Sequence, residues 1–140
     1  LVFTNETRDS SRIIANQKLD QKKTIRIYDE IKSYVRIAEI ALKRGDYKKI
    51  GEIFHEHWKI KKKLSKHISN SKLDRIYLNL LKEKSFIGGK LIGAGGGGFY
   101  LMVTKDINSS IKYLKSRKIN FTRLKFVEHG PNKIREGSWR

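Results

Sequence analysis

Residues 88–99 have the sequence GGKLIGAGGGGF and run directly into the segment FYLMV at residues 99–103. The second segment is apolar and partly β-branched, which predicts a buried strand. A flexible linker would mix glycine with serine and other polar residues, so this glycine run is interpreted as a structured loop. Clustered glycines allow positive φ at successive positions or a close approach to the main chain, and their bare amides can bind anions. A simple tight turn is the alternative, but it needs only one or two such positions.

The glycine run differs from two familiar phosphate-binding motifs. It lacks the Gly-Lys-Ser/Thr ending of a Walker A loop. In a Rossmann fingerprint the glycines follow a strand and open a helix, whereas here they lead into a strand. The helix N-terminus that would hold a pyrophosphate is therefore missing. We expect a glycine loop of another kind.

The chain is strongly basic. Its 140 residues, enough for a single domain, contain 32 lysines and arginines against 14 acidic residues, a net charge of +18. A basic surface attracts phosphate backbones, so the composition raises the possibility of binding to RNA or another polyanion. The positive charge is spread over nearly every segment, however, with isoleucine and asparagine throughout, as is typical of a lysine-rich proteome. We therefore expect only nonspecific electrostatic attraction to nucleic acid.

Several classes of protein and site are disfavoured by what the sequence lacks. Cysteine is absent, which excludes a disulfide framework, a thiol nucleophile and a thiolate zinc site. No long uncharged apolar run is present, so we expect no membrane span and a cytoplasmic location. His55 and His57 are two residues apart on a predicted helix and point to different faces, so no metal site is predicted. The chain opens in an apparent strand at residues 1–4, so we expect it to be the C-terminal part of a longer polypeptide.

The first half of the chain predicts a helical hairpin. A long helix is expected over residues 19–44, with an inward stripe of apolar residues at helical spacing, namely Ile27, Ile31, Val35, Ala38 and Leu42. Gly45 ends this helix and Asp46 caps the next one. The inward stripe of the second helix consists of Ile50, Ile53, Phe54, Trp58 and Leu64. Trp58 is assigned to the core because it lies on this stripe.

The second half predicts a small sheet. A third helix is expected to begin at a Ser71 cap, with an inward face formed by Leu73, Ile76, Tyr77, Leu80 and Leu81. After the glycine loop come a strand at residues 99–104, a helix at about residues 107–117 with Ile107, Ile111 and Leu114 inward, and a final strand region at about residues 119–128. The predicted fold class is α+β, a two-layer domain in which a helical hairpin and further helices pack on a small, mainly antiparallel sheet.

The sequence KLIGAGGGGF at residues 90–99 resembles the C-terminal glycine-rich motif of the galactokinase, homoserine kinase, mevalonate kinase and phosphomevalonate kinase (GHMP) family at almost every position. The segments TNETRDSS at residues 4–11 and WKIKKKLS at residues 58–65 resemble the branch of that family that phosphorylates heptose 7-phosphate. The order and spacing of these blocks cover essentially the whole chain. The resemblance implies that residues 1–140 form one domain, the C-terminal lobe of a sugar kinase.

The resemblance also implies an activity for the complete enzyme, which is transfer of the γ-phosphate of ATP to a hydroxyl of heptose 7-phosphate or a related sugar phosphate. Family members bind ATP and Mg²⁺ mainly through an N-terminal lobe, whose phosphate loop has no counterpart in this sequence. The catalytic and magnesium-binding carboxylates also belong mainly to that lobe. We therefore assign no catalytic or metal residue here. The N-terminal lobe, in cis or on a separate chain, is the implied partner, and this chain alone is expected to be inactive.

Phosphoryl transfer depends on positioning and on donors that stabilise developing charge. The resemblance places the loop near the ATP phosphates and the acceptor sugar, with these residues offering backbone amides: Gly93, Ala94, Gly95, Gly96, Gly97 and Gly98. An acceptor that already bears a phosphate also needs cations. Arg8, with its bidentate guanidinium, is the first candidate, and Lys61 or Lys62 is the second.

Lys90, at the start of the motif, is a candidate for electrostatic support of the loop. Consecutive lysines on a helix point in different directions, so most of the lysine run at residues 61–63 is expected to face water. Two interpretations stay open at this point. One is the substrate-side lobe of a sugar-phosphate kinase, and the other is a non-catalytic basic module that binds RNA or another polyanion and keeps the same fold.

Overall fold

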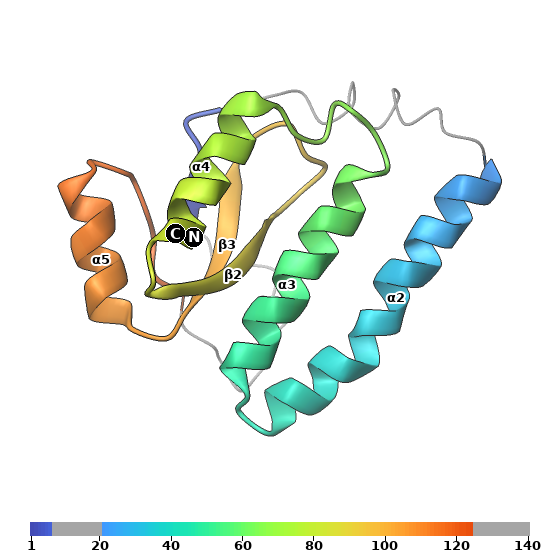
Figure 1. The fold of residues 1–140 in the computed structure, drawn as a ribbon, viewed down its shortest axis with the longest axis horizontal. Helices are drawn as coiled ribbons and strands as arrows, with labels where there is room; N and C mark the ends of the chain where they lie inside the picture. The colour runs from blue at the N-terminus through green and yellow to red at the C-terminus, as the bar shows by residue number, and fades with distance from the viewer. Residues whose placement is uncertain (7–20, 125–140) are drawn as a thin grey trace, which may run out of the picture.

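The computed structural model describes residues 1–6 and 21–124. Its elements in chain order are β1 (Val2–Phe3), α2 (Gln21–Lys43), α3 (Tyr47–Lys62), α4 (Ser71–Lys82), β2 (Phe86–Leu91), β3 (Phe99–Thr104) and α5 (Ile107–Ser116). The strands form an antiparallel sheet in the order β1-β3-β2. Helices α3 and α4 pack on this sheet, and α2 lies alongside α3 at the edge of the molecule (Figure 1). The predicted α+β class is confirmed.

The turn between α2 and α3 follows the local signals in the sequence. Gly45 has a φ of +66°, and the Asp46 side chain accepts a hydrogen bond of 2.9 Å from the Lys49 amide. The predicted inward face of α2 is correct in part, because Ile27 is buried and Ile31 packs against the core. Val35 and Leu42 are 65% and 49% exposed, however, and Ala41 is buried instead near the end of α2, which packs on α3.

Two further details of the helices were predicted wrongly. The N-cap of α4 is Asn70 rather than Ser71, since the Asn70 side chain accepts a hydrogen bond of 2.9 Å from the Leu73 amide. Ile107 is 37% exposed, although it was expected to point inward. It occupies the first turn of α5, beside the exposed Asp106 cap, while Leu114 in the last turns enters the core.

Strand β2 was not predicted, because Gly88 and Gly89 were assigned to the glycine loop. Gly88 lets α3 approach closely, whereas a Cβ at Gly89 would meet Leu101 and Met102 of β3. A Cβ added at Gly88 would lie 2.1 Å from the carbonyl oxygen of Gly51 in α3, and one added at Gly51 would lie 2.6 Å from Cγ2 of Ile87. Of the predicted last strand, Phe121 forms an isolated bridge with Val2, and residues 125–128 lie outside the described residues.

The centre of the core is aromatic and hydrogen-bonded. Trp58 is fully buried, which confirms its assignment to the core, and its ring makes edge contacts with Tyr77 and Tyr100. The Tyr77 hydroxyl donates to the Gly89 carbonyl at 2.9 Å, and the Tyr100 hydroxyl donates to the Leu73 carbonyl at 3.1 Å. Burial raises the pKa of both tyrosines, so both hydroxyls stay protonated. These bonds tie α4 to the sheet.

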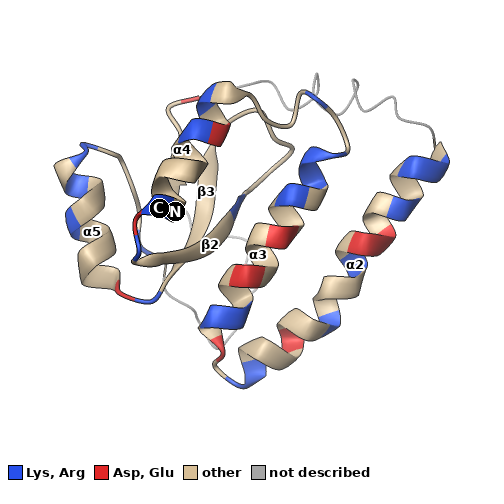
Figure 2. Cartoon of the chain, viewed as in Figure 1, with Lys and Arg blue, Asp and Glu red and all other residues tan. Residues whose placement is uncertain are grey.

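Lysine and arginine occur on every helix of the structure rather than on one face (Figure 2). The spread of charge expected from the sequence is therefore present in three dimensions. Among the described residues, no helix is long and apolar enough to cross a membrane.

We predict that Gly88→Ala destabilises the fold strongly, because the new Cβ meets the Gly51 carbonyl, which is main chain and cannot rotate away. The expected loss in the free energy of unfolding is about 3 kcal/mol, as for overpacked cores. Gly45→Ala is the control, since it introduces a left-handed alanine into open space and should cost only about 1 kcal/mol. Urea denaturation measures both. Equal losses would show that close packing of α3 on β2 is not needed.

Candidate functional site

The loop between β2 and β3 requires glycine for its backbone conformation. Positive φ values occur at Gly93 (82°), Gly95 (118°), Gly96 (76°), Gly97 (158°) and Gly98 (96°). An L-residue rarely adopts such values, so side chains are disfavoured along the whole loop. Two positions also allow close approach. A Cβ at Gly95 would lie 2.9 Å from Cα of Ile68, and one at Gly97 would lie 2.3 Å from the Glu6 carbonyl oxygen.

Neighbouring segments hold the loop from both sides. The Gly96 amide donates to the Ile68 carbonyl at 2.8 Å, and the Gly98 amide donates to the Glu6 carbonyl at 2.7 Å. The buried Thr4 hydroxyl donates to the Gly98 carbonyl at 2.8 Å. These bonds connect the loop to the segment before α4 and to the segment after β1. Two of the predicted amide donors are therefore already engaged inside the protein.

The remaining amides of the loop differ from these two. Within residues 1–6 and 21–124, the amides of Gly93, Ala94, Gly95 and Gly97 make no hydrogen bond. A glycine loop with unpaired amides can offer them to an anion. Gly95 is buried, so Gly93, Ala94 and Gly97 are the positions of the loop whose backbone can donate to a ligand.

Basic side chains from α3 and β2 gather beside the first glycine of the loop. The Lys61 ammonium donates to the Gly93 carbonyl, which fastens the loop to α3. The Lys90 ammonium on β2 lies 4.9 Å from the centroid of the Phe54 ring on α3. His57 stands one turn before Lys61, and its buried Nδ1 has no partner among the described residues. We call His57, Lys61 and Lys90 the basic cluster.

The groups of the basic cluster perturb one another. Burial, then Lys90 and Lys61, lower the pKa of His57 to about 4, so His57 is neutral at physiological pH. Burial and the neighbouring Lys90 lower the pKa of Lys61, and burial lowers the pKa of Lys90. Repulsion between cations and poor solvation thus both lower these pKa values. Among the described residues, no carboxylate contributes to the shifts.

Sequence reasoning did not select His57, because it tested the histidines only as metal ligands. The available signal was the i, i+4 spacing from Lys61, which places both side chains on one face of α3. The proximity of Lys90 could not be found in the same way, since it comes from a strand nearly thirty residues further along the chain.

Of the two other predicted cations, Lys62 lies elsewhere and Arg8 is outside the described residues. The Lys62 ammonium lies 3.0 Å from Asp74 Oδ1 and also over the Trp58 ring, so it links α3 to α4. The chain leads to Arg8 from Glu6, whose carbonyl accepts the Gly98 amide at the glycine loop. The roles proposed for both residues stay predictions.

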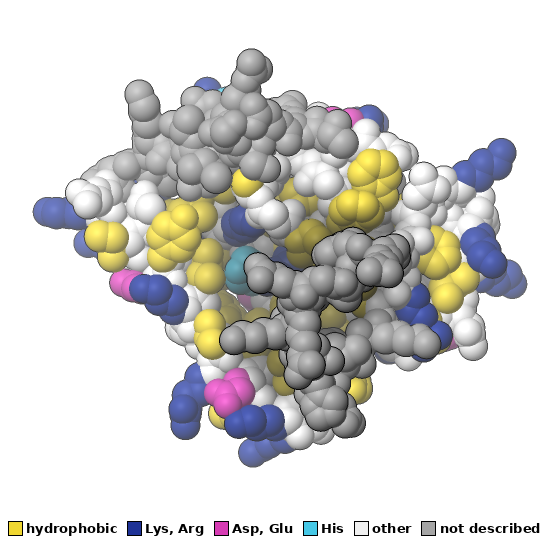
Figure 3. Space-filling view, turned by 180° about the vertical axis from the view of Figure 1, so that it is seen from behind, with side chains coloured by type: hydrophobic (Ala, Val, Ile, Leu, Met, Phe, Trp, Pro, Cys, Tyr) yellow, Lys and Arg dark blue, Asp and Glu magenta, His cyan; other side chains and the backbone are white. Residues whose placement is uncertain are grey.

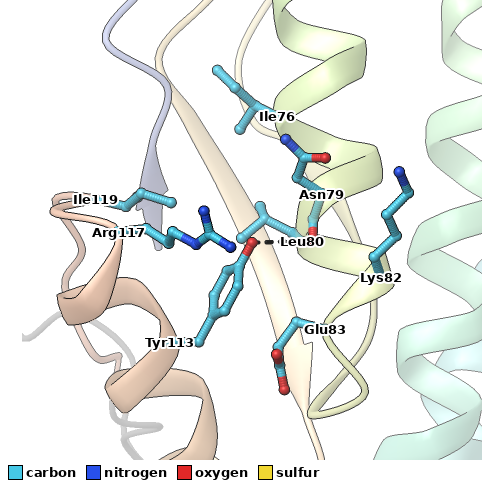
Figure 4. Close-up of a pocket in the computed structure, with 8 residues that line it drawn as sticks. All are labelled: Ile76, Asn79, Leu80, Lys82, Glu83, Tyr113, Arg117 and Ile119. Atoms are coloured by element: carbon cyan, nitrogen blue, oxygen red, sulfur yellow. Dashed lines mark hydrogen bonds between the residues drawn. The ribbon is translucent and has the colours of Figure 1, made fainter.

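A cavity of about 360 Å³ lies elsewhere, between α4 and α5 (Figure 4). Its lining consists of Ile76, Asn79, Leu80, Lys82, Glu83, Tyr113, Arg117 and Ile119, none of them a site residue predicted from the sequence. The Tyr113 side chain on α5 points toward α4, and its hydroxyl donates to the Asn79 carbonyl at 3.3 Å. Over the described ranges, no three His, Asp or Glu side chains group as a metal site would require.

The sequence profile described as GHMP kinases C terminal matches residues 38–110. The chain therefore belongs to the GHMP kinase family, and it matches the C-terminal domain of these kinases. The predicted family resemblance is confirmed. It is 32% identical to D-glycero-alpha-D-manno-heptose 7-phosphate kinase of Campylobacter jejuni, over all of this chain and 41% of that protein. It is 28% identical to L-fucokinase/L-fucose-1-P guanylyltransferase of Bacteroides fragilis, over 91% of this chain and 14% of that protein.

The fold is also similar to that of a solved kinase. The crystal structure of L. major mevalonate kinase in complex with R-mevalonate superposes with a TM-score of 0.72 and 22% sequence identity, over 83% of this chain and 37% of that one. The chain thus spans less than half the length of each of these relatives.

We predict that Gly97→Ala loosens the loop far more than Gly98→Ala. Both positions have positive φ, but a Cβ at Gly97 meets the Glu6 carbonyl, whereas a Cβ at Gly98 has no atom within 4 Å. Hydrogen exchange of the residue 98 amide, which donates to Glu6, reports on this contact directly. Much faster exchange is expected in Gly97→Ala, with near-normal exchange in the neighbouring variant. Equal protection in both would contradict the observed packing of the loop on Glu6.

Proposed function

We propose that this chain is the substrate-side, C-terminal part of an ATP-dependent kinase that transfers the γ-phosphate of ATP to a hydroxyl of heptose 7-phosphate or a related sugar phosphate. The observation that carries the proposal is the loop at residues 93–98, where left-handed glycines disfavour side chains and several amides have no partner in the part of the chain that the structure describes. Membership of the GHMP kinase family supports the reaction class, and similarity to proteins named as heptose-phosphate and fucose kinases supports a carbohydrate acceptor.

The loop suits phosphoryl transfer because that reaction needs fixed donors more than reactive side chains. Charge on the transferred group is best stabilised by dipoles that are already oriented. The Ile68, Glu6 and Lys61 contacts hold the loop, so the amides of Gly93, Ala94 and Gly97 can donate without reorganisation. A side chain larger than the methyl group of Ala94 would separate the main chain from the acceptor.

Cations near the loop would bind the phosphate that the acceptor already bears. Arg8 is proposed for this role because its guanidinium matches two phosphate oxygens at once. Lys61 and Lys90 reach the neighbourhood of Gly93, whereas Lys62 would first have to leave Asp74. Lys61 is therefore the stronger candidate of the two helix lysines.

Kinases of this family use ATP, typically with Mg²⁺. We assign the binding of ATP and Mg²⁺ mainly to an N-terminal part of the enzyme, in the same polypeptide or in a partner chain, because no phosphate-wrapping loop is recognisable in these 140 residues. The relatives are longer than this chain, which supports that division. A cytoplasmic location is proposed, since ATP and sugar phosphates are metabolites of that compartment.

We predict that two variants of the complete kinase change different kinetic constants. Gly97→Ala should lower kcat at least about tenfold, because its Cβ meets the Glu6 carbonyl and the resulting displacement of the loop misplaces the acceptor in the transition state. Arg8→Lys should mainly raise KM for the sugar phosphate, because a point charge replaces a bidentate fork. Steady-state kinetics with each substrate varied measure both effects.

Gly45→Ala is the matched control for the glycine variant, since it places an alanine at positive φ in open space outside the loop. Its kcat should equal that of the wild type. A near-normal kcat in Gly97→Ala would mean that the loop is only a turn, and the proposed function would lose its main support.

A further inference from the structure

The basic cluster differs from most of the other lysines near it, although the exposed Lys48 at the start of α3 also has no carboxylate within 4 Å among the described residues. In and directly after α3, Lys49, Lys59, Lys62 and Lys63 each lie within 4 Å of a carboxylate oxygen. Lys61 instead donates to a neutral carbonyl, and Lys90 stacks on an aromatic ring. Among the described residues, these two ammonium groups therefore lack the anionic partner that those four neighbours have.

The surroundings make this lack of a counter-charge costly. Burial lowers the pKa of each member of the cluster, and the lysines repel the protonated form of His57. The buried Nδ1 of His57 has no hydrogen-bond partner within the described residues. Seen from the side opposite to Figure 1, a histidine and Lys or Arg atoms lie close together among hydrophobic side chains near the middle of the molecule (Figure 3).

We propose that His57, Lys61 and Lys90 form a binding site for a phosphate monoester. Two ammonium groups supply the charge, and His57, as a neutral imidazole protonated at Nδ1, supplies a directional donor. Partial burial strengthens each interaction relative to open water. The ligand would be the phosphate end of the acceptor sugar, an assignment that rests on the proposed function.

The position of the cluster explains why this phosphate would belong to the acceptor. Lys61 also holds the Gly93 carbonyl, so the site adjoins the first glycine of the loop. An acceptor anchored by its phosphate at the cluster could extend its hydroxyls toward residues 93–98. The terminal phosphate of ATP offers the same chemistry, and an experiment must separate the two sources.

The test is an NMR titration of the His57 imidazole in the 140-residue chain, in phosphate-free buffer, assigned with His57→Gln. The pKa without ligand is expected at about 4. Saturating glucose 6-phosphate should raise it by about one unit or more, since a nearby anion favours the imidazolium. Lys90→Met should abolish the ligand-induced rise. Lys112→Met on α5 removes the same charge from an exposed position and should keep the rise.

Absence of any rise, or an equal rise in Lys90→Met, overturns the site. A rise with MgATP but none with the sugar phosphate overturns its assignment to the acceptor. In the complete kinase, Lys90→Met should raise KM for the sugar phosphate more than KM for ATP. Unchanged values for both would reject the cluster while leaving the proposed kinase activity intact, whereas phosphate binding with no kinase activity in the complete enzyme would reject only the proposed function.

Discussion

Helix α3 lies so close to strand β2 that neither Gly51 nor Gly88 has room for a Cβ. This contact determines the rest of the site. It brings His57 and Lys61 on the helix beside Lys90 on the strand, and it lets the Lys61 ammonium reach the Gly93 carbonyl. The glycines within β2 therefore serve packing, whereas those after it serve backbone conformation. One glycine-rich stretch has two physical roles.

The loop and the basic cluster divide the work of binding between backbone and side chains. In the proposed site, bonds to Ile68 and Glu6 fix the loop so that its other amides can donate to the substrate, while the cluster supplies charge next to the first glycine. The total charge of +18 explains little by itself, because lysine and arginine are spread over every helix (Figure 2). The pairing of each lysine with its neighbours matters more for a ligand than the total charge. Where neighbouring lysines are paired with carboxylates, exposed ion pairs leave little net potential for a ligand.

Features that depend on neighbouring residues in the sequence were predictable. The Gly45–Asp46 turn and strand β3 follow from stop, cap and periodicity signals. Features that depend on tertiary packing were not. Strand β2 was not predicted because Gly88 and Gly89 resemble loop residues unless the close packing of α3 on Gly88 and of β3 on Gly89 is known. Similarly, the exposure of Val35 depends on which face of α2 meets α3, and the role of His57 depends on distant Lys90.

The central claim is that these residues form the substrate side of a kinase whose ATP phosphates are held by another part of the enzyme. The most direct test measures sugar-phosphate-dependent ATP consumption by the 140-residue chain and by the longer polypeptide that includes an N-terminal lobe. Turnover is predicted only for the longer polypeptide, with heptose 7-phosphate as the preferred acceptor. Sustained turnover by the 140-residue chain alone, or none by the longer polypeptide with any sugar phosphate, would contradict the claim.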